Sequence, residues 1–227
     1  MVLSKTDGIE SQAIKPTCSS ESPKGELCTA RLQNLRPTQF CVGYQDVQRK
    51  RMKLSSGTPT QDSLSIYSAK NPGLAVIGPE DIIYLLDGHH RARALVEVSA
   101  DLFHVKILDD FSHLTMVDFW DTMISKKFVW LFDCEGRGPL SPLDLPESLQ
   151  GLKDDPYRTL AEDAQDRGAN KKLDVLYQEF YWANFYRSRI PTETVAQNYE
   201  AALTLAIQLA KMREAKDLPG FNGPQDP

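Results

Sequence analysis

The sequence predicts an α+β fold, in which a small mixed β-sheet with helices is extended by a helical C-terminal half. Two apolar runs, residues 74–77 and 82–86, are rich in β-favouring side chains, and the Gly78-Pro79-Glu80-Asp81 stretch between them is typical of a hairpin connection. Residues 105–108 predict a further strand, which follows a helical stretch. The second half of the chain is mainly helical in its spacing of apolar residues.

Four segments are expected along the 227 residues. The first is a polar N-terminal tail, because its Ser, Thr, Lys, Glu and Pro residues cannot bury an apolar face. A sheet-containing core, a helical extension packed on this core and a short C-terminal tail follow. Their predicted bounds are 1–27 for the first tail, 28–112 for the core, 113–218 for the helical extension and 219–227 for the second tail.

Three elements are predicted before the hairpin. A short strand is expected within residues 27–35, a helix over 42–52, and a short helix or extended piece at 64–67. The end of the 42–52 helix is basic, with Arg49, Lys50 and Lys53. The helix dipole stabilises positive charge at the helix C-terminus. Two interpretations are therefore open: the basic residues form a solvated helix end, or they form a second phosphate clamp.

Helix start signals organise the C-terminal half. The run from Thr115 to Asp118 matches a capping box, and Asp155-Pro156 is a suitable N-cap and first turn for a helix that Gly168 can close. An aromatic helix is expected over 176–186, with core packing as its default role. Residues 195–209 predict one long helix that docks on the core or forms a homodimer with a second subunit.

Composition bounds the class of protein. A net charge of −5 and a pI near 5.4 oppose non-specific binding to nucleic acid. The chain begins without the apolar core of a signal peptide, and no window approaches the roughly 20 apolar residues of a membrane helix. We therefore expect a soluble, cytoplasmic protein without a membrane partner. Its cysteines fit no zinc or redox motif and are expected to be reduced thiols, although a Cys18–Cys28 disulfide stays open.

The stretch around residues 82–95 is the predicted functional site. An apolar strand ends at Asp87-Gly88, and a helix begins at the next residues. The first turn of a helix presents unpaired N–H groups and the positive end of the dipole, and Gly88 lets a ligand approach the backbone. Arg91 and Arg93 add permanent positive charge. Phosphate is the expected ligand.

Asp87 and the histidines leave alternatives open. Asp87 is a turn or helix-capping residue in one interpretation, and a general base or magnesium ligand in the other. His89 and His90 diverge by about 100° on a helix, so at most one of them coordinates a metal. His104 and His113 are expected to pack or cap. The common phosphate-loop, dinucleotide, nucleophile-elbow and zinc-helix motifs are absent.

The stretch from Leu85 to Leu95 resembles the signature of the ParB/sulfiredoxin superfamily, and the chain is most similar to its ParB-like nuclease family. The resemblance covers roughly residues 30 to 190. It is supported by further motifs along the chain, at residues 35–39, 42–44, 110–114, 119–120, 154–158 and 180–183. It implies a ParB/sulfiredoxin-like sheet as the core of the predicted α+β fold.

The resemblance also implies site residues. Members of the superfamily bind nucleotide phosphates at the helix N-terminus, which corresponds to Gly88, His90 and Arg91. Help from an earlier helix maps loosely to Gly43, Tyr44 and Lys50. His89 stands where sulfiredoxins have a reactive cysteine, which excludes their thiol chemistry, and Gln39 stands where the free-serine kinases have a carboxylate. No helix-turn-helix like that of the chromosome-partitioning members follows.

The function expected from the sequence is binding of ATP, ADP or another nucleotide with Mg²⁺, followed by phosphoryl transfer or hydrolysis. Asp87 and His90 are the expected catalytic residues, and Asp87 is also the expected metal ligand. A metal-dependent nuclease on DNA or RNA is one alternative, and a non-catalytic protein-interaction module built on the aromatic helices is another. The predicted nucleotide-binding residues are Gly43, Tyr44, Lys50, Gly88, His89, His90, Arg91 and Arg93.

Overall fold

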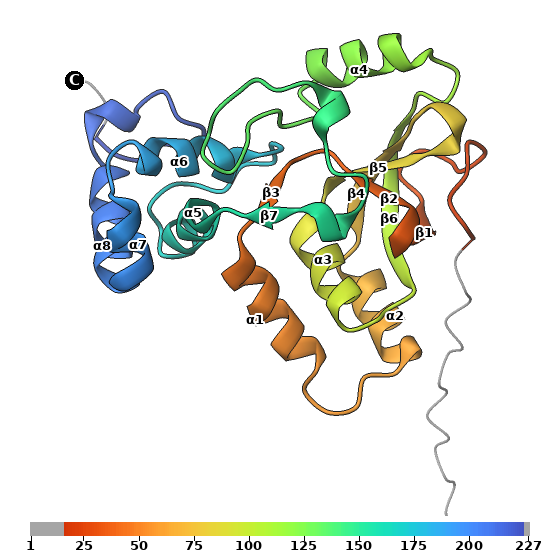
Figure 1. Cartoon of the computed structure of the whole chain (residues 1–227), viewed down its shortest axis with the longest axis horizontal. Helices are drawn as coiled ribbons and strands as arrows, with labels where there is room; N and C mark the ends of the chain where they lie inside the picture. Colours follow the sequence, from red (N-terminus) through yellow and green to blue (C-terminus); the bar gives the residue numbers. More distant parts are fainter. Residues whose placement is uncertain (1–15, 225–227) are drawn as a thin grey trace, which may run out of the picture.

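The computed structural model describes residues 16–224, which form a sheet module and a helical module (Figure 1). The sheet module runs from β1 to α4, and the helical module runs from α5 to α8. The strands are β1 Leu27–Arg31, β2 Leu35–Pro37, β3 Cys41–Val42, β4 Gly73–Ile77, β5 Ile83–Asp87, β6 Leu102–Asp110 and β7 Lys153–Asp154. The helices are α1 Tyr44–Leu54, α2 Gln61–Lys70, α3 His89–Glu97, α4 Met116–Ser125, α5 Pro156–Asp166, α6 Gln178–Arg187, α7 Thr192–Gln197 and α8 Tyr199–Leu209.

Five strands form the main sheet, in the order β1-β6-β4-β5-β2. The β4–β5 pair is antiparallel, with Ile77 opposite Ile83, which confirms the predicted hairpin. β1 pairs antiparallel with β6, whereas β6–β4 and β5–β2 are parallel pairs. The sheet is therefore mixed, and the predicted α+β class is confirmed.

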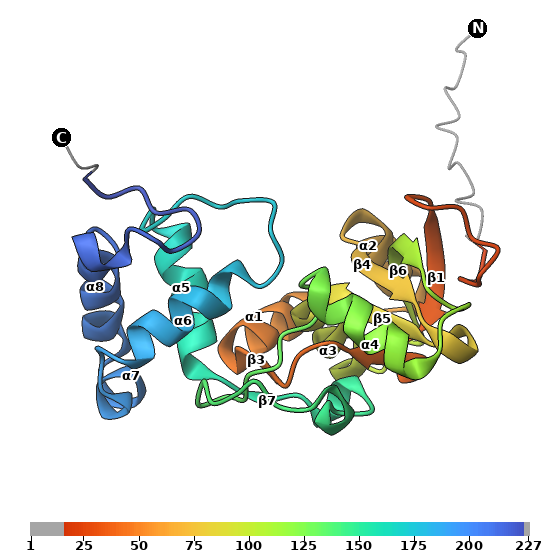
Figure 2. The same cartoon turned by 90° about the horizontal axis from the view of Figure 1, so that it is seen from above.

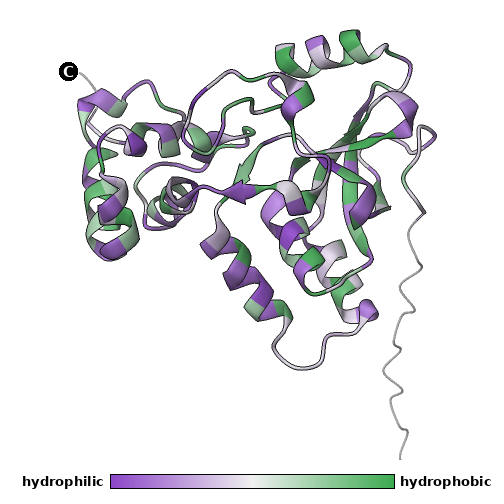
Figure 3. Cartoon of the chain, in the orientation of Figure 1, coloured by the Kyte–Doolittle hydropathy of each residue, from purple (hydrophilic) through white to green (hydrophobic). Residues whose placement is uncertain are grey.

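The sheet buries both of its faces. In β5, Leu85 points to a core beneath α1, α2 and α3, while its neighbours Tyr84 and Leu86 point to a second core beneath α4. Successive side chains of a strand alternate between faces, so this continuous apolar run serves a sheet that is covered on both sides. Apolar residues accordingly line the strands in Figure 3, whereas α1 is largely hydrophilic.

The helical module has a hydrophobic core of its own, which α5, α6 and α8 share. Trp182 and Tyr186 of the aromatic helix α6 are fully buried in it, and the Trp182 indole N–H donates to the Pro219 carbonyl (2.8 Å). The aromatic stripe of α6 thus packs inward, with Tyr181 the partly exposed member at 39%. Figure 2 shows this module beside the sheet module, with α1 reaching α5 where the two meet.

The single long helix predicted over 195–209 is wrong. Asn198 interrupts it with φ −143° and ψ 68°, so that α7 ends at Gln197 and α8 begins at Tyr199. The Asn198 side chain accepts a hydrogen bond from the Ala201 N–H (3.3 Å). Asparagine caps a new helix more readily than it continues one, and this local bond is the physical reason for the break.

The other predicted helix starts are found in the structure. At the start of α4, the Thr115 hydroxyl accepts a hydrogen bond from the Asp118 N–H (3.2 Å). At the start of α5, the Asp155 carboxylate accepts a hydrogen bond from the Tyr157 N–H (2.9 Å). Gly168 follows α5 with φ +81°, a left-handed conformation that suits glycine. None of the described helices is long and apolar enough to cross a membrane.

The expectation of reduced thiols is wrong, because all four cysteines are paired as Cys18–Cys28 and Cys41–Cys134. The first bond joins β1 to the segment before it, where the Cys18 N–H donates to the Thr29 carbonyl (2.9 Å). The part of the predicted N-terminal tail from residue 16 on is therefore held against β1. Residues 1–15 and 225–227, which the predicted tails include, lie outside the described residues.

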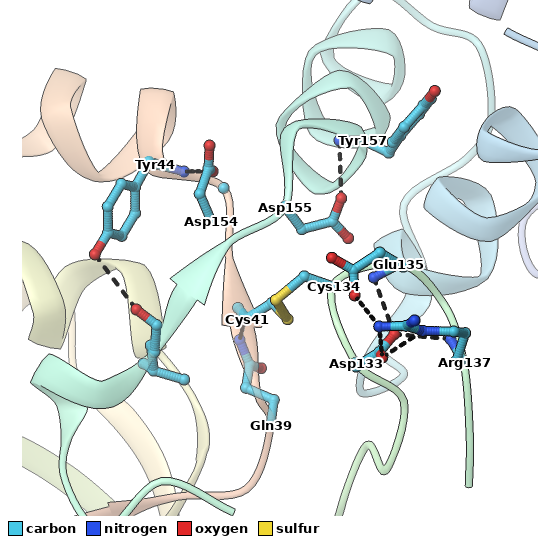
Figure 4. Close-up of a disulfide and its surroundings, with 12 residues drawn as sticks. Gln39, Cys41, Tyr44, Asp133, Cys134, Glu135, Arg137, Asp154, Asp155 and Tyr157 are labelled. Carbon is cyan, nitrogen blue, oxygen red and sulfur yellow. Dashed lines mark hydrogen bonds and ion pairs between the residues drawn. A yellow bond between two sulfur atoms is a disulfide. The ribbon is translucent and has the colours of Figure 1, made fainter. Parts of the chain in front are cut away.

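The second disulfide lies where the two modules meet (Figure 4). Cys41 belongs to β3, which pairs in parallel with β7 just before α5. Around the bond, Trp130, Tyr177 and Phe180 form an aromatic cluster, called the junction cluster below. The pairing of residues 93 apart could not be recognised from cysteine spacing, because it depends on this tertiary contact.

Candidate functional site

A cleft of about 1030 Å³ lies where the sheet module meets the helical module. Its wall takes residues from α1, α3, α5 and α6, together with the connection after α4 and the loop before α6. Other lining residues come from β4, β5, β6 and α4. Further lysines and aspartates also line the cleft, and the ionisable residues used below are Asp46, Lys50, Asp87, His90, Arg91, Arg158, Glu162 and Glu179.

The turn between β5 and α3 forms one side of the cleft. Gly88 has φ +98°, and a Cβ atom there would lie 3.1 Å from both the Gly73 Cα and the Arg91 guanidinium. Only glycine meets both conditions without strain. α3 begins at the next residue, and no side chain caps its first turn. The free N–H groups and the helix dipole therefore favour an anion at this point.

The two adjacent histidines of this turn have different surroundings. The His90 ring lines the cleft, and its Nε2 accepts a hydrogen bond from the Gly43 N–H (2.9 Å). An accepting Nε2 assigns the proton of the neutral ring to Nδ1. Burial and the nearby Arg158 charge lower the pKa of His90 well below its usual value, so the ring is neutral at pH 7.

His89 points into the protein interior instead. Its Nε2 accepts from the Thr38 N–H (3.3 Å), and burial lowers its pKa to about 3. It is 3% exposed and does not line the cleft. The structure thus separates the two rings as the helical geometry requires, and His89 joins α3 to the chain after β2.

Four ion pairs join residues of the cleft wall to one another. Lys50 binds Asp46 (2.6 Å) within α1, and Arg91 binds Asp87 (3.0 Å) across the glycine turn. Arg158, which is only 7% exposed, lies between Glu162 (3.0 Å) and Glu179 (3.5 Å). Within these ion pairs three cations are shared among four carboxylates, so none of the paired cations is free for a phosphate that arrives alone.

The electrostatic shifts follow from these pairs. Burial opposes the charge of Arg158, but Glu179 and Glu162 outweigh it and raise the pKa of the guanidinium. Burial likewise opposes ionisation of Glu162, and Arg158 and its neighbours lower the pKa of this carboxyl to about 2. At Asp87, burial is outweighed by Arg91, which lowers the pKa of the carboxyl. All of these side chains are charged at neutral pH.

One group of described residues could hold a metal ion. Asp46, His90 and Glu162 each offer one ligand atom, and the three atoms lie within 4.8 Å of one another. The Gly43 N–H already occupies the lone pair of His90 Nε2, so the two carboxylates are the stronger donors. Two carboxylate oxygens suit a hard cation that keeps several waters, as Mg²⁺ does.

Apolar side chains also line the cleft. Its wall includes five large apolar side chains that are 39% to 50% exposed. Exposed apolar groups that line a cavity beside charged ones mark a binding surface for a ligand with both characters. We call these five side chains the apolar arm, and they belong to Leu108, Ile124, Leu173, Val175 and Tyr181.

Several predicted residues lie outside the cleft wall. Arg93 donates to the Leu149 and Gln150 carbonyls (3.1 and 3.0 Å) and stacks over the Tyr44 ring, 5.2 Å from its centroid. Tyr44 in turn donates to the Leu152 carbonyl (3.3 Å). Gly43 supports His90 through its N–H. Of the predicted set, Lys50, Asp87, Gly88, His90 and Arg91 line the cleft together.

Sequence reasoning predicted Lys50 of α1 but missed Asp46 on the same helix and the acidic and basic residues that α5 and α6 contribute. Arg158 and Glu162 lie one turn apart on α5, and Glu179 lies on α6. The run 154–158 ended on this arginine, but it was used only to support a resemblance. A buried arginine is recognisable in a structure by the carboxylates around it, whereas the sequence shows only a common helical residue.

Comparisons with known proteins bear on the whole of this site. The family described as Putative ParB-like nuclease matches residues 28–188. The chain belongs to this ParB-like family. The matched range includes every charged residue of the cleft named above. No curated protein matches the chain.

A solved structure has the same fold. Protein Atu1540 from Agrobacterium tumefaciens is 32% identical, and the match covers 88% of this chain and 100% of that one, with a TM-score of 0.77. The match extends well beyond the sheet, because 88% of the chain is more than the sheet module contains. The ParB-like fold, including its helical module, is thus shared with this relative.

Proposed function

We propose that this ParB-like protein binds a nucleoside di- or triphosphate together with Mg²⁺ in the cleft, and that it transfers or hydrolyses the terminal phosphoryl group. The observation that carries the proposal is the mixed lining of the cleft, which combines charged residues and a helix N-terminus with the exposed apolar side chains of the apolar arm. A nucleotide has the matching character, because its phosphates are anionic and its base is flat and largely apolar on its faces.

The charge of the cleft favours a nucleotide that comes with a cation. Because four carboxylates share three cations in the ion pairs beside α3, a phosphate that came there alone would meet repulsion from those carboxylates. Asp46 and Glu162 would hold Mg²⁺, because their ligand atoms lie within 4.8 Å of each other, whereas Asp87, the ligand expected from the sequence, is not part of this group. When bound, Mg²⁺ neutralises phosphate charge and polarises the phosphoryl group.

The residues of the chain have separate roles in this proposal. Arg91 and the first-turn N–H groups of α3 bind phosphate oxygens, and Lys50 and Arg158 add positive charge. His90 is neutral with its proton on Nδ1, so it donates a hydrogen bond to a phosphate or leaving oxygen. Asp87 stays ionised beside Arg91 and can accept a proton from the attacking hydroxyl or water.

Calorimetric titration with ATP, ADP and CTP, with and without Mg²⁺, tests the proposal. We expect binding that requires Mg²⁺, and an Arg91→Ala variant that binds about tenfold or more weakly, because a charge-assisted hydrogen bond is lost. Arg93→Ala is the matched control, since Arg93 lies on the same helix but outside the cleft. Binding of no nucleotide, or equal losses in both variants, contradicts the proposal.

A metal-dependent nuclease is the second candidate, and the Asp46–His90–Glu162 group and the family description favour it. The acidic chain disfavours it, because polyanion binding relies on clustered lysine and arginine. Incubation with single- and double-stranded DNA and RNA plus Mg²⁺ or Mn²⁺ separates the two. Cleavage that disappears in His90→Ala supports the nuclease, whereas cleavage that persists in this variant comes from a contaminant.

A further inference from the structure

The Cys41–Cys134 disulfide lies beside the cleft and is covalently joined to two parts of its architecture. Cys41 is two residues before Gly43, whose N–H fixes the His90 ring (2.9 Å). Cys134 follows the connection after α4, and residues 126–132 of this connection line the cleft together with Pro139. We call residues 126–139 the wall segment. The bond thus links the support of His90 to the wall segment.

The wall segment contains no helix or strand of its own. Its backbone is held by single hydrogen bonds: the Trp130 N–H donates to the Thr38 carbonyl (2.9 Å), and the Leu140 N–H closes the segment on the Leu131 carbonyl (2.7 Å). The Phe128 N–H donates to the Met123 carbonyl (2.8 Å), and the Phe128 carbonyl accepts from the Tyr177 hydroxyl (2.9 Å). A segment without regular structure relies on side-chain packing and cross-links for its order. Here Phe128 and Val129 pack on the core beneath α4, and Trp130 belongs to the junction cluster around the disulfide.

The two sulfur atoms differ in accessibility. Cys41 is 1% exposed, whereas Cys134 is half-buried and lines a second pocket of about 480 Å³, which shares no lining residue with the cleft. A reductant can therefore reach Cys134 without first entering the cleft. The other disulfide has both cysteines buried and neither of them in the cleft wall, so it provides a natural comparison.

We propose that the Cys41–Cys134 disulfide is a redox latch on the cleft, which orders the wall segment when oxidised and releases it when a dithiol reduces it. One thiolate of the dithiol attacks the Cys134 sulfur, the S–S bond breaks, and Cys41 leaves with the electron pair and takes up a proton. The second thiol then displaces Cys134, which is protonated in turn. Two electrons and two protons reach the protein, and the dithiol leaves as a disulfide.

The wall segment is the part of the chain that responds. Reduction removes the covalent restraint but leaves the sheet hydrogen bonds intact, so β4 and β6 stay protected. The hydrogen bonds that the amides of Trp130, within the wall segment, and Leu140, directly after it, donate break more often, because the segment has lost its cross-link. The latch therefore acts locally, on the wall of the cleft next to His90.

Hydrogen exchange measured by mass spectrometry tests the latch without any nucleotide, so its outcome is independent of the proposed reaction. The full chain is compared before and after treatment with dithiothreitol, after peptide mapping under non-reducing conditions. We expect both disulfides in the mapping, and exchange in residues 126–141 that becomes about tenfold or more faster on reduction, while β4 and β6 keep their protection.

Two double variants complete the test. Cys41→Ser with Cys134→Ser should show fast wall exchange that no longer responds to dithiothreitol, whereas Cys18→Ser with Cys28→Ser should keep the full response. Should the first variant fail to fold, the reduced wild-type chain carries the comparison. Free thiols at 41 and 134 in the purified protein, unchanged wall exchange on reduction, or loss of protection throughout the sheet would each overturn the latch.

Discussion

At the scale of single residues, Arg158 carries the largest consequence for stability. It is 7% exposed and forms ion pairs with both Glu162 and Glu179. Removal of one partner of a buried ion pair leaves an uncompensated charge and costs about 3–5 kcal/mol. We therefore expect Arg158→Ala to lower the free energy of unfolding by about that amount in urea titrations. Arg167→Ala, which removes an exposed pair with Glu200, should change it little.

The same variant has a signature in its pH dependence. The folded pKa of Glu162 is about 2 and its unfolded value is 4.5, so its ionisation stabilises the protein fully above pH 4.5, and this contribution is lost as the pH falls toward 2. Without Arg158 the folded pKa rises, and the stability that this carboxylate adds near pH 4 disappears. Parallel pH profiles for the wild type and Arg158→Ala would contradict this assignment.

The sequence could predict those site residues that lie on one continuous stretch. Asp87, Gly88, His90 and Arg91 follow from a strand, a glycine and a helix start, which are local features. His89 and Arg93 belong to the same stretch, but helix rotation directs them elsewhere. The residues that α5 and α6 contribute lie more than 60 positions after this stretch in the sequence, and only the packing of the two modules brings them to the cleft.

At the scale of elements, the β5–α3 junction depends on a residue with positive φ. Gly88→Ala places a side chain in the left-handed region, at about 1–2 kcal/mol, and also pushes its Cβ against the Gly73 backbone. We expect a larger loss in thermal stability than this conformational cost alone. Gly168→Ala is the control, because Gly168 has φ +81° but no atom within 4 Å of the added carbon. Equal losses at both sites would show that the space around Gly88 is unimportant.

Elements with strong local signals were predicted well. The hairpin, α3 and the starts of α4 and α5 follow from apolar runs, turn residues and capping side chains. The region 27–35 was less clear, because it holds β1, a single 3-10 turn and the start of β2 in quick succession. The α7–α8 break at Asn198 was missed, since apolar periodicity continues through a residue whose side chain caps a new helix.

At the scale of the whole molecule, the two disulfides should differ in their effect on stability. They close segments of 93 and 10 residues, and the entropy removed from the unfolded chain grows with this separation. Loss of Cys41–Cys134 should therefore lower the free energy of unfolding by up to about 2 kcal/mol more than loss of Cys18–Cys28 does. Urea unfolding of the two double serine variants measures the difference, and the reverse order would contradict this account.

The fold class was predictable, but the separation into two cores was not. A hairpin, a further strand and a mainly helical second half indicate an α+β chain, and the structure and its relative Atu1540 agree with that. The helical module buries its own apolar residues, and α4 covers the sheet. Both arrangements depend on which amphipathic faces meet, and helical periodicity identifies a face without identifying its partner.

The β3–β7 ladder gives this arrangement a further consequence. It pairs Cys41 and Val42 with Lys153 and Asp154, immediately before the helices α1 and α5 that contribute Lys50 and Arg158. Two pairs of opposed residues in this ladder therefore set the distance between Lys50 and Arg158, two of the ion-paired cations of the cleft. A substitution far from any ligand that shifts this ladder by one residue would re-space the charges, so binding specificity in ParB-like relatives can diverge without a change in any residue that touches the ligand.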